Sequence, residues 1–136
     1  MSTRSNIVLE KNGHYYVIYS HWDGYPDNNG KILLEHYTDP KKIFKLIGLG
    51  DISSLGSQIG EKHDFDNPPK DVVNAYHRDR GEPWKNTKYG KFEDKEKALK
   101  VCDNDYTYLF ENGEWLFREG NGDFKKLTPK DCVDNA

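Results

Sequence analysis

Two Asn-Gly pairs, each between two runs of β-branched and aromatic residues, constrain the fold of this chain more than any other feature. The pairs are Asn12-Gly13 and Asn112-Gly113. Asn-Gly readily adopts the positive φ angles of a tight hairpin turn, so each pair predicts two antiparallel strands joined directly. The expected strands are residues 6–10 and 14–20 around the first pair, and residues 106–111 and 114–118 around the second. We therefore expect one β-hairpin near each end of the chain.

A helical periodicity follows the first hairpin. Apolar residues recur at helical spacing in two stretches that flank Asp39-Pro40. An acid followed by proline is typical of a helix start, and Gly48 and Gly50 provide a stop. A third, lysine-rich helix is expected to open at Asp94. The side chains predicted to be buried on these helices are Leu33, Leu34, Tyr37, Ile43, Phe44, Ile47, Ala98, Leu99 and Val101.

The middle of the chain is less regular. Residues 51–70 are rich in Gly, Ser, Asp and Pro, which predicts a long surface loop. Residues 72–78 begin with two valines and lie between Pro69 and Gly81, which favours a strand over a helix. The glycines of residues 48–56 lack the Gly-Lys-Ser/Thr ending of a phosphate-binding loop, so helix-ending turns explain them better.

Together these elements predict an α+β fold. The antiparallel sheet would be built from the N- and C-terminal β-hairpins plus a middle strand, with about three short helices on one face. At this length one domain, residues 1–136, is the natural organisation.

Composition excludes several classes of function. Against 20 basic side chains there are 23 acidic ones, and the net charge of −3 gives no support for binding duplex nucleic acid. No segment has the apolar length of a membrane span or a signal sequence, so we expect a cytoplasmic protein without a membrane partner. Cys102 and Cys132 are the only cysteines and form no Cys-x-x-Cys pair, which excludes a zinc ribbon. We expect both thiols to be reduced, although one disulfide remains possible.

Two His-x-Asp units beside large aromatic residues are the candidate ligand site. They lie in residues 20–26 and 76–82. If residues 78 and 80 are on a strand, their guanidinium groups share a face and suit phosphate oxygens. The aromatic rings suit a nucleotide base, and the Asp23 carboxylate suits a ribose hydroxyl. The predicted ligand-binding residues are Trp22, Asp23, Tyr25, Arg78, Arg80 and Trp84. The alternative is a packed loop closed by a Gly-Tyr-Pro turn, and for the arginines an exposed strand edge neutralised by nearby acids.

A metal site is another interpretation of the same units. His21, Asp23, His77 and Asp79 would form a two-His, two-carboxylate cluster if their strands were neighbours, and such a cluster could activate water for hydrolysis. No activated nucleophile accompanies either unit, which favours binding over catalysis.

Several blocks of this sequence together resemble a family of small phage and prophage proteins, over nearly the whole chain. The blocks are residues 4–7, 21–26 (His-Trp-Asp-Gly-Tyr-Pro), 30–37, 50–56, 76–82 and the Tyr-x-Tyr-Leu-Phe of residues 106–110. The chain is also similar to the first type of Thoeris anti-defence protein. Those proteins are non-enzymatic sponges that sequester cyclic ADP-ribose isomers, and some bind cyclic oligonucleotides, at sites between protomers. The resemblance implies a phage-encoded homo-oligomer that acts in the bacterial cytoplasm.

The expected function is therefore non-enzymatic sequestration of a nucleotide-derived immune signal, with no cofactor and no metal. The roles assigned to Trp22, Asp23 and the arginines rest on side-chain chemistry, not on the resemblance. The alternative is a protein-binding inhibitor of a host enzyme, anchored by an aromatic loop around Trp22, since tryptophan is prominent in binding hot spots. A metal-dependent hydrolase is the third interpretation.

Overall fold

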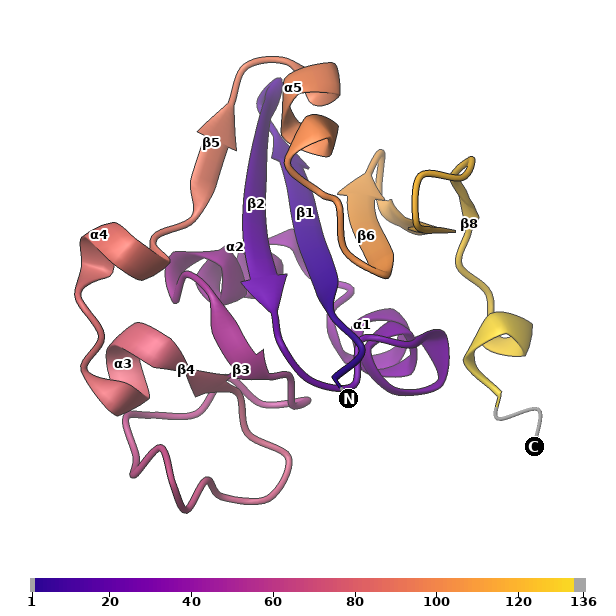
Figure 1. Cartoon of the computed structure of the whole chain (residues 1–136). Coiled ribbons are helices and arrows are strands. Elements are labelled where there is room, and N and C mark those ends of the chain that lie inside the picture. The colour runs from indigo at the N-terminus through magenta and orange to yellow at the C-terminus, as the bar shows by residue number, and fades with distance from the viewer. Residues whose placement is uncertain (1, 134–136) are drawn as a thin grey trace.

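The fold is α+β, as predicted, and is organised around an eight-stranded mixed sheet (Figure 1). The computed structural model describes residues 2–133. The strand order is β4-β3-β2-β1-β6-β7-β8, and β5 also pairs with β2. The strands are β1 (Ser5–Lys11), β2 (His14–Ser20), β3 (Ile52–Ser54), β4 (Asn74–Ala75), β5 (Gly90–Phe92), β6 (Tyr106–Glu111), β7 (Glu114–Glu119) and β8 (Lys125–Lys126). The helices are α1 (Lys31–His36), α2 (Pro40–Gly48), α3 (Tyr76–Arg80), α4 (Trp84–Thr87) and α5 (Lys95–Lys100), with a π-helical turn η1 (Pro26–Gly30) and a 3-10 turn η2 (Pro129–Cys132).

Both predicted hairpins are confirmed. Asn12 and Gly13 have φ angles of 53° and 79°, and Asn112 and Gly113 have 54° and 79°, as a tight turn with two positive φ angles requires. The sheet is mixed rather than purely antiparallel, because the two hairpins join through their first strands. β1 pairs with β6 in parallel, and the long segment between the hairpins provides the crossover that a parallel pair needs.

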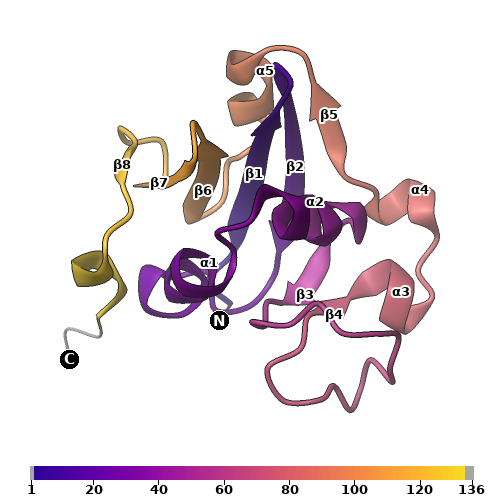
Figure 2. The same ribbon diagram turned by 180° about the vertical axis from the view of Figure 1, so that it is seen from behind.

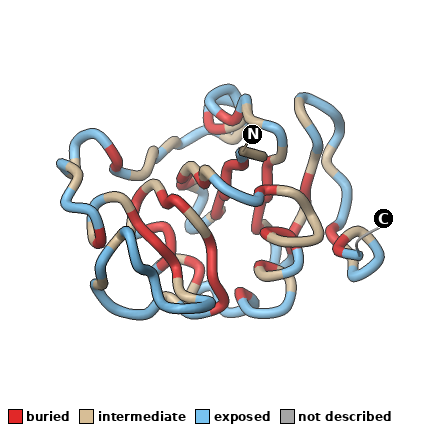
Figure 3. Tube along the Cα trace, turned by 60° about the horizontal axis from the view of Figure 1, so that its bottom comes forward, coloured by how far each residue is buried: buried red, intermediate tan, exposed pale blue. Residues whose placement is uncertain are grey.

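The sheet is covered on both faces, which corrects the expectation that all helices lie on one side. Alternate residues of β1 point to opposite faces: Ile7 and Leu9 belong to the larger apolar cluster with α1 and α2, and Val8 to a smaller one. α5 covers the smaller cluster with Ala98. In Figure 2, α2 lies in front of the strands β1 and β2. In Figure 3, the buried residues are concentrated in the interior of the molecule and the exposed ones in the outer loops.

Local capping chemistry confirms the predicted helix starts. The Asp39 carboxylate accepts the main-chain N–H of Lys41 at 2.9 Å at the start of α2. The Asp94 carboxylate accepts the N–H of Glu96 at 2.8 Å and opens α5 in the same way. Val101, predicted to be buried, is instead 50% exposed, because α5 ends just before it.

The middle strand expected over residues 72–78 is present but much shorter than predicted. Asn74–Ala75 forms β4, Val72 makes an isolated bridge to Gln58, and the chain turns into α3 at Tyr76. The buried Asp79 carboxylate accepts the main-chain N–H of Ala75 at 2.7 Å, which fixes the first turn of the helix despite the preceding valines. β3 also interrupts the loop predicted over residues 51–70.

Both cysteines are free and buried. Cys102 packs in the α5 cluster and Cys132 in the larger cluster across the sheet, so the fold does not form the disulfide that their spacing allowed. Within residues 2–133, no helix combines the length and apolar character needed to span a bilayer.

Candidate functional site

The His21–Tyr25 loop leaves the end of β2 in a fixed conformation. Asp23 adopts a φ of 54°, in the left-handed region. The main-chain N–H of Trp22 donates to the Ser53 carbonyl at 2.9 Å, and that of Gly24 donates to the Thr3 carbonyl at 2.8 Å. A Cβ at residue 24 would lie 2.8 Å from the Cβ of Ser5, so only glycine fits there.

Buried polar side chains hold this loop from inside. The Asn29 amide donates to the hydroxyls of Ser5 and Ser20, at 3.2 Å each. The Tyr108 hydroxyl donates to the Gly24 carbonyl at 2.7 Å. The loop is therefore pre-organised, which lowers the entropy cost of binding a ligand there.

Trp22 lies on the outside of this loop. It is 46% exposed, one of three large apolar side chains that are open to solvent among residues 2–133. The edge of its neighbour His21 lies against it, with ring centroids 4.8 Å apart. The Tyr19 hydroxyl is 2.7 Å from Nδ1 of His21, so the three rings form a continuous row along the end of β2.

His21 also lines an open hollow of about 540 Å³, which we name the N-terminal hollow. Its lining residues are Ser2, Arg4, His21, Asp103, Asn104 and Asp105. The sheet register brings them together, because Ser5 pairs with both Ser20 of β2 and Tyr106 of β6. Residues just before β1, just after β2 and just before β6 therefore meet at one edge of the sheet.

Hydrogen bonds fix the floor of the N-terminal hollow. The main-chain N–H of Arg4 donates to Asp105 Oδ2 at 3.0 Å, and the Asn104 amide donates to Asn6 Oδ1 at 2.7 Å. Burial raises the pKa of Tyr19, while the positive charge of nearby Arg4 acts in the opposite direction. Arginine, imidazole, carboxylates and amide thus surround one solvent-filled space.

Arg78, predicted to bind phosphate, is instead part of a buried structural network. Its guanidinium donates to both oxygens of Asp79, at 2.9 and 3.1 Å, and to the carbonyls of Val73 at 2.7 Å and Ile59 at 2.8 Å. Burial alone would raise the pKa of Asp79, but the hydrogen bonds from Arg78, Ala75 and His63 and the guanidinium charge lower it below its usual value. This network fastens the loop before α3.

The other predicted contacts on α3 and α4 are separate from the Trp22 loop. Arg80 is exposed, pairs with Glu82 at 3.3 Å and lies over the Phe65 ring at 5.2 Å. Since it is on a helix and not on a strand, it does not share a face with Arg78 as predicted. Trp84 packs against His77 and Tyr89, with ring centroids 5.3 and 5.9 Å away.

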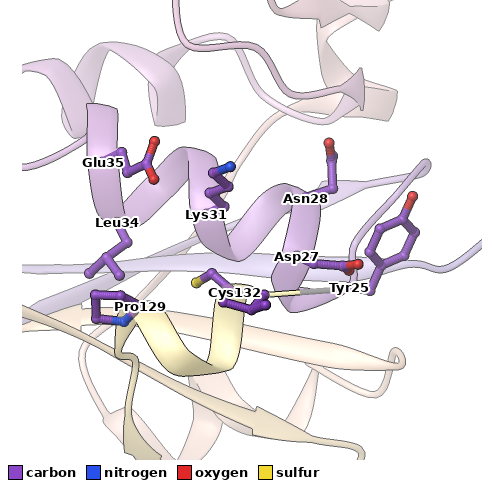
Figure 4. A pocket seen from close by; sticks show the side chains of 9 residues that line it. Tyr25, Asp27, Asn28, Lys31, Leu34, Glu35, Pro129 and Cys132 are labelled. Atoms are coloured by element: carbon purple, nitrogen blue, oxygen red, sulfur yellow. The ribbon is translucent and has the colours of Figure 1, made fainter. Parts of the chain in front are cut away.

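Tyr25 lines a second, larger hollow of about 780 Å³ (Figure 4). Asp27, Lys31 and Glu35 follow one another along its helical wall, and Pro129 and Cys132 of η2 close the opposite side. The Tyr25 hydroxyl donates to Asp23 at 3.1 Å, so Asp23 supports the loop rather than standing apart as a ligand contact. Burial raises the pKa of the Cys132 thiol to about 11, which keeps it protonated and unreactive.

The two His-x-Asp units do not combine into the predicted metal cluster. Asp79 is enclosed by the Arg78 network, and Nδ1 of His77 is 2.7 Å from the Glu82 carbonyl. Among residues 2–133, no three His, Cys, Asp or Glu side chains gather as a metal site would require.

The sequence-based assignment missed Arg4, Asp103 and Asp105. Each precedes a strand that was predicted, so the missing signal was the parallel pairing of β1 with β6. Comparisons with protein-family models, with curated proteins and with solved structures found no match for this chain.

Proposed function

We propose that the protein binds a nucleotide-derived small molecule at the N-terminal hollow and holds it without chemical conversion. One observation carries this proposal. Of the four arginines, Arg4 alone has a guanidinium without a carboxylate or carbonyl partner among residues 2–133. It lines the hollow together with His21, whose ring packs against the exposed Trp22. Within residues 2–133, the one hydrogen bond of the Arg4 side chain is to the Ser2 hydroxyl, at 3.4 Å.

Each group around the hollow suits one part of such a ligand. The Trp22 ring provides a flat face for a base, and the Arg4 fork can pair with two phosphate oxygens. Asp103 and Asp105 are exposed carboxylates that accept hydrogen bonds from sugar hydroxyls. Since those carboxylates would repel a bare phosphate, a ligand that carries both sugar and phosphate is favoured over an inorganic anion.

The resemblance to phage anti-defence proteins supplies the biological setting. A phage protein that binds an immune nucleotide tightly in the bacterial cytoplasm lowers its free concentration, and affinity alone achieves this. A homo-oligomer is part of the same proposal.

Calorimetry against a panel of cyclic ADP-ribose isomers and cyclic oligonucleotides tests this function. Arg4→Ala should lose about 1.5–3 kcal/mol of binding free energy, the value of a charge-assisted contact. Arg80→Ala is the matched control, because it removes an exposed arginine elsewhere and should bind normally. Heating the complex should release intact ligand. Degraded ligand would instead identify an enzyme, and unchanged binding by both Arg4→Ala and Trp22→Ala would move the site elsewhere.

A protein partner is the second candidate, since Trp22 is 46% exposed on a fixed loop. In that case no nucleotide on the panel would raise the melting temperature, and Trp22→Ala would abolish co-purification of a defined host enzyme.

A further inference from the structure

A third hollow lies beside the N-terminal hollow, on the face of the sheet that α5 covers. It measures about 220 Å³, and we name it the edge hollow. Its walls include Phe92 of β5 and Val101 after α5, and its polar groups include Asp51 and Tyr19. Phe92 packs with the α5 cluster and Val101 is half exposed, so the hollow has apolar walls and an open mouth.

Asp51 occupies a gap in the strand pairing. β5 pairs with β2 at residues 15–17, and β3 pairs with β2 at Ser20. Between these two pairings, the main-chain N–H of Tyr19 donates to Asp51 Oδ1 at 3.0 Å. Asp51 Oδ2 accepts no hydrogen bond from any residue within 2–133, and the carboxylate lines the edge hollow.

Placing a carboxylate in this gap costs free energy, because the charged group loses part of its hydration. Burial raises the pKa of Asp51 to about 6, against the smaller lowering effect of the Tyr19 N–H. Lys88 also lines the edge hollow, but among the described residues neither Lys88 nor any other basic side chain forms an ion pair with Asp51. An asparagine would accept the same N–H without burying a charge, so the negative charge points to a role beyond the sheet.

Tyr19 connects this hollow to the proposed ligand site. Its ring lines the edge hollow, and its hydroxyl contacts His21, which lines the N-terminal hollow. Ring centroids along the row are 6.0 Å apart from Tyr19 to His21 and 4.8 Å apart from His21 to Trp22. A ligand with two planar groups can therefore reach both hollows from one side of this row.

We propose that the edge hollow is a second base-binding subsite, in which Asp51 accepts hydrogen bonds from the N–H edge of an amino-bearing base. This inference rests on the proposed function, with the first base on Trp22 and the sugar–phosphate portion beside Arg4. Guanine presents a ring N–H and an amino group side by side, which suits a carboxylate acceptor. The ligand class is then a nucleotide with two bases, at least one of them amino-bearing.

Binding of cyclic di-GMP, its inosine analogue and GMP to the intact protein tests this subsite. The inosine analogue lacks only the amino groups, so cyclic di-GMP should bind about tenfold or more tightly, the discrimination of one good base contact. GMP, with a single base, should bind much more weakly than cyclic di-GMP. Asp51→Asn keeps an acceptor for the Tyr19 N–H but offers an amide to the base, so it should lose the preference for the amino group.

Asp123→Asn is the matched control, since it neutralises an exposed carboxylate that lines neither hollow, in the segment between β7 and β8. Equal affinity of the wild-type protein for cyclic di-GMP and its inosine analogue would overturn the subsite, as would an unchanged preference in Asp51→Asn. Both results leave the proposed function intact. Failure of every nucleotide on the larger panel to bind the wild-type protein would overturn the proposed function as well.

Discussion

Replacing Arg78 with alanine should destabilise the fold severely, although the sequence pattern had suggested a ligand contact. The Asp79 side chain is 0% exposed and the Arg78 side chain only 15% exposed. Removing the guanidinium leaves a buried carboxylate without its counter-charge and also removes the donors to the Val73 and Ile59 carbonyls. Breaking a buried ion pair by deleting one partner costs about 3–5 kcal/mol.

Part of this loss is offset by the bonds that remain. Asp79 keeps the N–H groups of Ala75 at 2.7 Å and His63 at 3.1 Å. Nε2 of His63 lies 3.6 Å from the carboxylate and can supply positive charge when the imidazole is protonated. We therefore expect the lower half of that range, about 3–4 kcal/mol, which is a large part of the stability of an ordinary domain.

Urea denaturation of Arg78→Ala, Arg78→Lys and Arg80→Ala measures this effect. Lysine restores the charge but cannot contact both carboxylate oxygens and two carbonyls at once, so it should recover only part of the loss. Arg80→Ala should change stability by at most about 1 kcal/mol, because its pair with Glu82 is exposed. A loss below about 1 kcal/mol in Arg78→Ala, accompanied by lost nucleotide binding, would refute this reasoning and restore Arg78 as a ligand contact.

Three further predictions concern burial and backbone geometry. The raised pKa of Asp51 means that the folded state holds its proton more tightly than the unfolded state, so the associated stability is present below about pH 4 and is lost as the pH rises through about 6. Asp51→Asn should accordingly be more stable than the wild type at pH 7, by clearly less than the ~3 kcal/mol of the full shift because solvent screens this partly exposed carboxylate, with no advantage at low pH in urea titrations. Gly50→Ala should cost at least about 2 kcal/mol in the same assay, because φ is +77° and its Cβ would strike the carbonyl at the end of α4, whereas Gly48→Ala meets open space and should be tolerated. Cys102 and Cys132 should resist maleimide labelling until the protein unfolds, because both are buried and burial raises the pKa of their thiols to about 12 and about 11. Rapid labelling of the native protein would contradict this packing.

Features that depend on neighbours in the sequence could be predicted from it. The conformations of the Asn12-Gly13 turn and of the Asp39 and Asp94 helix caps depend on residues within a few positions, so the local sequence was enough to predict them. The π-helical turn η1 had no such local signature. It depends on buried Asn29, whose amide contacts serines in two different strands.

The strand predicted over residues 72–78 ends early, at Ala75, for a related reason. Val72 and Val73 favour extended backbone, but carbonyls of the preceding loop and of Val73 accept hydrogen bonds from Arg78. The bonds from Arg78 to the loop carbonyls of Ile59 and Gly60 span 19 and 18 positions in the sequence, and the bond to the Val73 carbonyl spans 5. Local β-propensity spans only about 1 kcal/mol, whereas a conformation that left the buried Asp79 carboxylate without its arginine would cost about 3–5 kcal/mol, so tertiary contacts decide the conformation.

The candidate site shows how strand register selects functional residues. Since Ser5 lies opposite both Ser20 and Tyr106, the residues one step beyond each strand end must come together. A register shift of one residue in β6 would turn Tyr108 toward α5 and move Asp105 away from Arg4, so the buried aromatic face enforces the geometry of the hollow. The hairpins that were easiest to predict therefore determine a site that neither hairpin reveals alone, because the parallel β1–β6 pairing joins them.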